Sequence, residues 1–173
     1  MRRKTGEQLG LAETWMSMAE LLLATNQPSE AEQLLRNALE EFKKENSRDD
    51  EIAATGLLAR ALLEQGKSAE AGKTIEQAKT MVARVDNPYV QSNFFVEAAR
   101  VQAFSGKSTE AVATLESVIQ TAGKFGFLNT QLKARLALAI LSRKGLASTS
   151  SSKLLNWLEF PVLPSHSLRY DLC

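Results

Sequence analysis

The strongest constraint on the fold is a spacing of forty residues between positions of the same kind. Two series of alanines follow it: Ala19, Ala59, Ala99 and Ala139, then Ala31, Ala71 and Ala111. Self-similarity at one fixed spacing is typical of a solenoid, because a single repeat cannot bury its apolar face alone and must stack on its neighbours. The sequence therefore predicts an array of stacked units.

Larger apolar residues keep the same frame around the alanines. The middle unit has Leu58, Leu62, Ile75 and Ala78, and each of these has an apolar counterpart one unit earlier. Apolar residues spaced three and four apart lie on one face of a helix. We expect the alanines to let paired helices approach closely and the larger residues to fill the space between pairs.

Helix breakers divide the chain into segments of helical length. Pro28 and Pro88 suit the first turn of a helix, Ser68 and Asn87 are expected caps, and Gly123 with Gly126 is expected to end a helix. We predict helices over about residues 8–24, 28–45, 50–65, 69–84, 88–104, 109–123, 130–145 and 149–159. Helices joined by short turns, with no alternating strand pattern, predict an all-α fold of antiparallel helix pairs.

Composition excludes several classes of protein. The chain has 173 residues and a formal net charge of +1, which argues against a nucleic-acid-binding surface. No apolar run reaches the roughly 18 residues of a membrane span, and no apolar stretch follows Arg2, Arg3 and Lys4 as a signal peptide would require. We therefore expect a cytoplasmic protein without direct membrane contact. Its one cysteine, Cys173, cannot form an internal disulfide.

The last 28 residues change in composition but keep part of the frame. Ser151, Leu155 and Leu158 fall forty residues after Ala111, Leu115 and Val118. We predict a repeat domain over residues 1–145 and a second segment, residues 146–173, with a capping helix and an irregular tail. Such a cap would cover the apolar end that a solenoid otherwise exposes.

The pattern Trp15-x2-Met18-Ala19-x2-Leu22, followed by Ala31-x3-Leu35, resembles the tetratricopeptide repeat (TPR) family. The resemblance covers about residues 8–145, with a period of 40 where the family has about 34. It implies a right-handed superhelical solenoid of about 3.5–4 repeats that acts as a non-enzymatic scaffold for a protein or peptide. The longer period resembles degenerate repeats in bacterial signalling regulators.

In such a solenoid the first helix of each pair lines the concave face. The residues expected there are Glu13, Met16, Glu20, Ala53, Gly56, Arg60, Leu63, Asn93, Val96, Arg100, Ala103, Lys133, Leu136, Ile140 and Arg143. Arg60, Arg100 and Arg143 would form a basic line that could bind an acidic or carboxylate-ended peptide. The alternative is that these arginines are only solvated. Gly56 could leave room for a ligand or for a neighbouring helix.

Residues for catalysis or for cofactor binding are lacking. Gly66-Lys67-Ser68 and Gly106-Lys107-Ser108 imitate the end of a phosphate loop, but both lack its upstream glycine and follow a predicted helix. His166 and Cys173 have no third partner, and the acidic run Asp49-Asp50-Glu51 suits a helix amino end better than a metal site. We predict no enzyme activity, no cofactor and no metal.

Three functions stay open at this point. The first is an interaction scaffold that binds a protein or peptide on its concave face. The second is the ligand- or partner-sensing portion of a larger bacterial transcription regulator or Ser/Thr kinase, and the third is a self-association module. The sequence does not indicate an oligomeric state.

Overall fold

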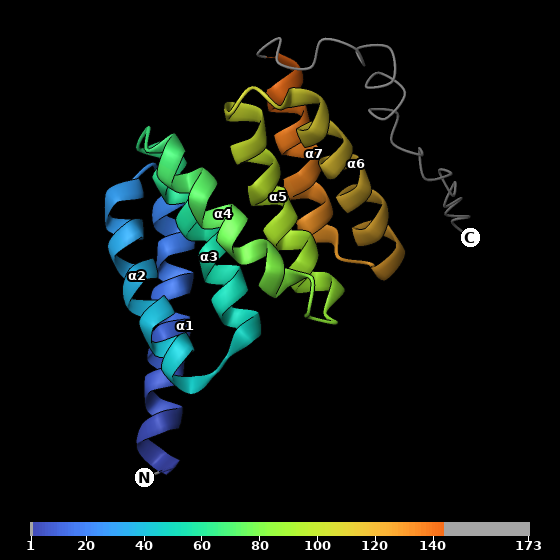
Figure 1. The fold of residues 1–173 in the computed structure, drawn as a ribbon. Coiled ribbons are helices and arrows are strands. Elements are labelled where there is room, and N and C mark those ends of the chain that lie inside the picture. The colour runs from blue at the N-terminus through green and yellow to red at the C-terminus, as the bar shows by residue number, and fades with distance from the viewer. Residues whose placement is uncertain (1, 144–173) are drawn as a thin grey trace, which may run out of the picture.

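The fold was analysed in a computed structural model that describes residues 2–143, and these residues contain seven α-helices and no strand (Figure 1). The helices are α1 (Arg2–Ala24), α2 (Pro28–Glu45), α3 (Arg48–Glu64), α4 (Ser68–Val82), α5 (Pro88–Phe104), α6 (Ser108–Phe125) and α7 (Leu128–Arg143). The predicted all-α class is confirmed. The predicted eighth helix and the tail lie outside the described residues.

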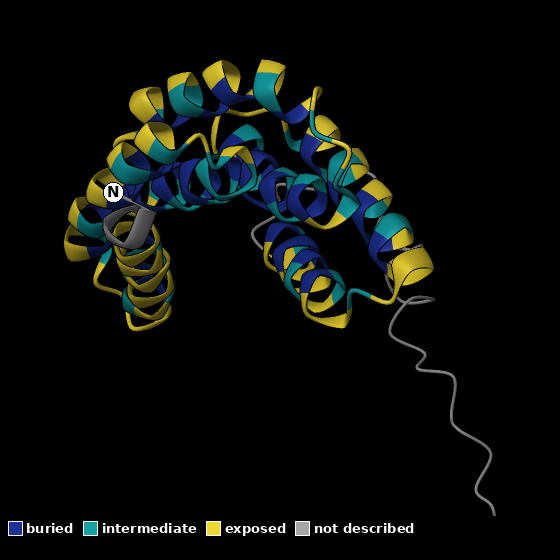
Figure 2. Ribbon diagram, turned by 90° about the horizontal axis from the view of Figure 1, so that it is seen from below, coloured by how far each residue is buried: buried dark blue, intermediate teal, exposed yellow. Residues whose placement is uncertain are grey.

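The helices pack in two rows that together form an arch (Figure 2). In the inner row α1 contacts α3, α3 contacts α5, and α5 contacts α7. Each outer helix, α2, α4 and α6, packs against the inner helices that precede and follow it in the chain. The described residues therefore form three helix pairs and one further inner helix, as the predicted solenoid requires. Its inner row lines the concave side of the arch.

The repeated alanines lie where paired helices meet. Ala19, Ala31, Ala59, Ala71, Ala99 and Ala111 are all fully buried. A methyl side chain lets two helix backbones approach more closely than a larger side chain would, since interaxial distance depends on the side chains at the contact. The prediction that alanine recurs at the helix contacts is confirmed.

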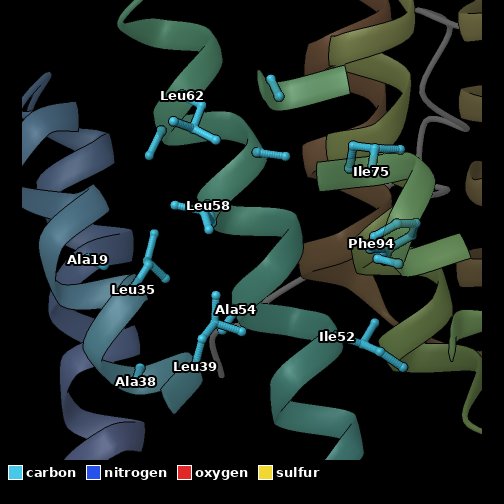
Figure 3. Close-up of a cluster of buried hydrophobic side chains, with 14 of the residues drawn as sticks. Ala19, Leu35, Ala38, Leu39, Ile52, Ala54, Leu58, Leu62, Ile75 and Phe94 are labelled. Carbon is cyan, nitrogen blue, oxygen red and sulfur yellow. The ribbon is translucent and has the colours of Figure 1, made fainter. Parts of the chain in front are cut away.

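Larger apolar side chains fill the space between successive pairs. Leu35, Ile75 and Leu115 occupy equivalent positions in the three outer helices, and all are buried. Figure 3 shows α3 between its two neighbours, with Leu35 of α2 on one side and Phe94 of α5 on the other. The buried residues form two core clusters, one that spans α1 to α5 and one between α5, α6 and α7, and Phe95 packs against both.

The turns follow a spacing of their own, half that of the repeat. The described residues with positive φ in a helix-ending turn are Asn26, Asn46, Gly66, Gly106 and Gly126. After Gly66, the backbone N–H of Lys67 donates to the carbonyl of Leu62 at 2.9 Å, and each of the other four turns has the same six-residue hydrogen bond. This bond satisfies a carbonyl that the helix end would otherwise leave without a partner. These left-handed residues are therefore twenty or forty positions apart, and they end five of the first six helices.

Some predicted helix ends were wrong. The first helix begins at Arg2 and not near residue 8, and α6 continues through Gly123 to Phe125, with Gly126 as its C-cap. Ser68 is not a cap but the first residue of α4, where no side chain caps the helix. The prediction for Asn87 is confirmed, because its Oδ1 accepts hydrogen bonds from the backbone N–H groups of Tyr89 and Val90.

A buried carboxylate on α2 ties the first pair to the turn that follows α3. Glu32 accepts hydrogen bonds from Lys67 Nζ at 2.8 Å, Gln65 Nε2 at 2.7 Å and Arg36 Nη2 at 2.6 Å. The bond from Lys67, with those from Arg36 and Gln65, lowers the pKa of Glu32 to about 2 against the opposing effect of burial. Glu32 is therefore a charged structural tie at neutral pH.

No helix among the described residues has both the length and the apolar character needed to cross a membrane.

The turn conformation predicts that replacing glycine by alanine has opposite effects on stability at Gly66 and at Gly72. Gly66 has φ of +79°, whereas Gly72 lies inside α4, and a Cβ at either position would meet no atom within 4 Å. We expect Gly66→Ala to lower the free energy of unfolding by about 1 kcal/mol, because an L-residue is strained in this conformation. We expect Gly72→Ala to raise it by about 0.5–1 kcal/mol. Urea denaturation measures both, and shifts of the same sign would contradict this account of the turns.

Candidate functional site

Most of the residues predicted to line the concave face are accessible in the structure. They lie on the inner row at exposed or half-buried positions: Glu13, Met16, Glu20, Ala53, Arg60, Leu63, Asn93, Arg100, Lys133, Leu136, Ile140 and Arg143. Helix geometry explains this result, since residues three and four apart share one face and the repeat brings that face to the same side in every unit.

Gly56, Val96 and Ala103 are buried, so their prediction as exposed lining residues was wrong. A Cβ on Gly56 would lie 3.6 Å from Phe94 Cδ2 and 3.8 Å from Glu97 Cβ, both on α5. Gly56 therefore makes room for the neighbouring helix, one of the two roles predicted for it. Val96 and Ala103 pack in the second core cluster with residues of α6 and α7. These three positions lie on the flank of the helix, where the next unit covers them.

The cations at the centre of the concave face each lie beside a carboxylate. Arg60 Nε donates to Glu64 Oε1 at 2.7 Å, and Arg100 Nε lies 3.2 Å from Glu97 Oε2. The first pair lies on α3 and the second on α5. At Arg60 and Arg100 the predicted basic line is therefore balanced by neighbouring carboxylates, which the sequence analysis did not identify.

Glu97 is the most unusual charged group of this face. Its side chain is 8% exposed, and neither its Oε2 nor the Nε of Arg100 makes a hydrogen bond in the described structure. Burial raises the pKa of Glu97, while the positive charges of Arg100, Arg60 and Lys133 act in the opposite direction. The positive charges of three helices, α3, α5 and α7, therefore act on one buried carboxylate.

An ion pair joins the two ends of the inner row. Lys133 Nζ of α7 donates to Glu20 Oε1 of α1, although 113 residues separate them in the sequence. Both residues were predicted to line the concave face, but sequence periodicity does not reveal that they meet. The pair shows how far the arch curves, because two side chains are enough to span from the first described helix to the last (Figure 2).

Apolar side chains complete the face. Ile140 is 40% exposed on α7, and Met16 is half-buried on α1. Leu136 is also exposed, but it falls forty residues after Val96 and therefore lies on the flank of α7. Phe104, which is 60% exposed at the end of α5, falls forty residues after Glu64. Sequence reasoning missed Glu64 and Phe104 as lining residues, although the repeat frame places them four residues after Arg60 and Arg100. The concave face thus combines ion pairs with exposed apolar groups.

Asn93 has a structural partner on this face. Its Oδ1 accepts a hydrogen bond from Thr130 Oγ1 of α7 at 3.1 Å, and its Nδ2 donates to the carbonyl of Tyr89. Because Thr130 is fully buried, this contact holds α5 to α7. Asn93 is therefore less available to a ligand than Arg60 or Arg100.

A second hollow, which the sequence did not predict, lies between the outer helices α2 and α4 over α3. Its volume is about 500 Å³, and its lining is mixed: Arg36, Leu39, Glu40, Lys43, Glu51, Thr55, Leu58, Thr74, Gln77, Ala78 and Met81. The outer helices do not pack against each other here, since both pack on α3. The hollow is open and lacks a concentrated set of reactive groups.

Among residues 2–143, no group of three or more histidine, cysteine, aspartate or glutamate side chains is arranged to hold a metal ion. The pKa of Glu97 is raised, but the charged groups that act on it are mainly cations, and none is a nucleophile. His166 and Cys173, considered above as a possible reactive pair, lie outside the described residues.

These features define a class of protein, the helical-repeat solenoids whose paired helices present a concave face. Comparison with known proteins gives the family. Residues 22–92 match the family model described as tetratricopeptide repeat. The resemblance to this family that the sequence implied is therefore confirmed over residues 22–92.

Solved structures of the same fold support this result. Two crystal structures of nearly identical TPR-like repeats from a putative kinesin light chain of Podosopora anserina, one of them a point variant, align with TM-scores of 0.57 and 0.54. Each is 24% identical in sequence, and the alignments cover 86% of this chain and 71% or 72% of the other. This likeness shows a shared fold. No curated protein matches the sequence.

The environment of Glu97 predicts a pH-dependent effect of its neutral isostere. Because the pKa is raised in the folded state, stability falls as pH rises from the unfolded value of 4.5 towards the folded one. We expect Glu97→Gln to raise the free energy of unfolding at about pH 7 and to lose this advantage near pH 4. Urea denaturation at the two pH values measures the difference.

The exposed Glu110 offers a control for this experiment, since Glu110→Gln removes the same charge from α6 without removing a buried group. It should change stability little at either pH. If Glu97→Gln instead lowered stability at neutral pH, attraction to Arg100 would outweigh the cost of burying the carboxylate.

Proposed function

We propose that this chain is a non-enzymatic scaffold that binds a segment of another protein along its concave face. The observation that carries the proposal is the convergence of the inner helices α1, α3, α5 and α7 on one surface that offers both charged and apolar groups. TPR repeats generally mediate contacts between proteins. The fold thus supports the general function, and the residues of the face support a choice of partner.

The partner that this face suits is a peptide with exposed carboxylates. Within the described part of the chain, the hydrogen bond that the Arg60 side chain donates uses Nε, which leaves the two Nη groups to a ligand. Arg100 makes no side-chain hydrogen bond there. Arginine can bind a carboxylate through two parallel N–H groups. Glu64 and Glu97 lower the net charge of the face, so carboxylates must be placed at the arginines to bind well.

Apolar side chains beside the arginines would add binding energy of a second kind. Ile140 and Phe104 are exposed, and covering them removes apolar surface from water. A segment that alternates acidic and apolar residues would satisfy both sets of groups. Its polar side chains would meet Arg60 and Arg100 while its apolar ones meet α7 and the end of α5.

The role as a sensing portion of a larger bacterial regulator stays a prediction, and so does a cytoplasmic location. Reading the coding sequence across both ends of this frame tests the first. An in-frame DNA-binding or kinase region would make the concave face the receiving part of a regulator. It would leave the proposed mode of binding unchanged.

Removal of the arginines should weaken binding of an acidic peptide. The probes are a synthetic peptide of alternating glutamate and leucine and a matched peptide with glutamine in place of glutamate, both carrying a fluorophore. We expect the Arg60→Ala/Arg100→Ala variant to bind the acidic peptide at least about tenfold more weakly, because hydrogen bonds to charged groups contribute about 1.5–3 kcal/mol each. Fluorescence anisotropy measures the affinities.

Two exposed cations away from the concave face provide the matched control. The Lys73→Ala/Arg84→Ala variant also removes two positive charges, from α4 and from the residues that follow it. It should bind the acidic peptide like the unmodified chain. Equal weakening of both double variants would mean that net charge alone attracts the peptide, and no weakening in either would contradict a role for the arginines.

A further inference from the structure

The last described helix exposes an apolar stripe at the open end of the stack. Leu128, Leu132 and Leu136 of α7 are 70%, 60% and 59% exposed, and they are spaced four residues apart along one side of the helix. Ala139 on the same side is also exposed. Large apolar side chains gathered on one face of a soluble chain mark a surface that another element covers.

The repeat frame shows what this face does in the earlier units. Equivalent positions forty and eighty residues before Leu132, Leu136 and Ala139 are all buried: Ser92 and Ile52, Val96 and Gly56, Ala99 and Ala59. In α5, Val96 and Ala99 share a core with the outer helix of the same pair and with the next inner helix. On α7 the covering elements are missing from the described residues. The stripe is therefore the counterpart of the face that the outer helix and the next inner helix cover in the earlier unit.

The sequence after Arg143 has residues in the repeat frame that an outer helix would need. The residues of α6 that cover α5 include Ala111, Leu115 and Val118, all buried. Forty residues later the sequence has Ser151, Leu155 and Leu158, which again are one small residue and two larger apolar ones. Gly145 falls within one residue of the place that Gly66 and Gly106 hold in the earlier units, so a turn residue is present as well.

We propose that residues 149–159 pack on α7 as the outer helix of a fourth pair and cover Leu132, Leu136 and Ala139. The segment begins only a few residues after Arg143, so its effective concentration at this face is of the order of millimolar or higher. A second copy of the chain would have to compete with this intramolecular contact. The proposal concerns the end of the stack and does not depend on the concave-face function.

The packing would also limit self-association. At the other end, Met18 and Leu21 of α1 are exposed, whereas their equivalents in α5, Ala98 and Val101, are buried in the core shared with the preceding units. An uncovered α7 face could stack on this α1 face of a second copy, and such a head-to-tail contact does not close on itself. Covering α7 from within the chain removes one of the two surfaces that such a polymer needs.

Thiol labelling of the full chain tests the contact. In a Cys173→Ser background, Ala139→Cys places the probe on the covered face, and Ala113→Cys places a reference on an exposed position of α6. We expect the Ala139→Cys thiol to react with a maleimide at least about tenfold more slowly than the reference, since reaction requires the segment to open. Adding Leu155→Asp should abolish this protection.

Two controls separate docking from other causes. Phe160→Asp changes a residue forty positions after the exposed Gln120, so it should leave the labelling of the Ala139→Cys thiol slow. The thiol of Ala59→Cys lies at a buried position of α3, which packs against α4. It should stay protected in the Leu155→Asp and Phe160→Asp variants, which would show that the stack remains folded.

Three results would overturn the proposal. The first is an Ala139→Cys thiol that reacts as fast as the Ala113→Cys reference. The second is protection that Leu155→Asp leaves intact, and the third is protection that disappears on dilution, which would assign the covering element to a second copy.

Discussion

Close approach of paired helices at alanine is the contact on which the rest of the structure depends. Ala59 of α3 and Ala71 of α4 are fully buried, and their equivalents in the neighbouring pairs are buried too. A side chain of one carbon sets the distance between the two helices of a pair, and that distance sets where the larger Leu35, Ile75 and Leu115 can fill the space between pairs. The stack and its curvature follow from repetition of this one contact.

Curvature in turn determines the chemistry of the concave face. Because the inner helices converge there, the charges of Arg60, Arg100 and Lys133, from three different helices, all act on the carboxyl group of Glu97. The same convergence lets Lys133 reach Glu20 on α1. None of these groups is unusual on its own helix, and the mixed character of the face arises from the bend of the whole array.

The repeat frame accounts for what could be predicted from the sequence. It located the helices, the buried alanines and the inner row, because all of these depend on local periodicity. It could not show that Gly56 and Val96 are buried, since this depends on how far each neighbouring unit turns around the helix. Nor could it reveal the Glu20–Lys133 pair, which depends on the sum of all those rotations. The carboxylates at Glu64 and Glu97 were within reach of the frame, but only the arginines beside them were considered.

The most direct test of the account compares two alanines on the same helix. Ala111 of α6 is fully buried at the contact with α5, and Ala113, two residues later, is exposed. If close approach at alanine holds the pairs together, Ala111→Leu should lower the free energy of unfolding by about 1–3 kcal/mol in urea denaturation. Ala113→Leu should change it by less than about 0.5 kcal/mol. Equal effects of the two substitutions would contradict the central role of the alanine contact.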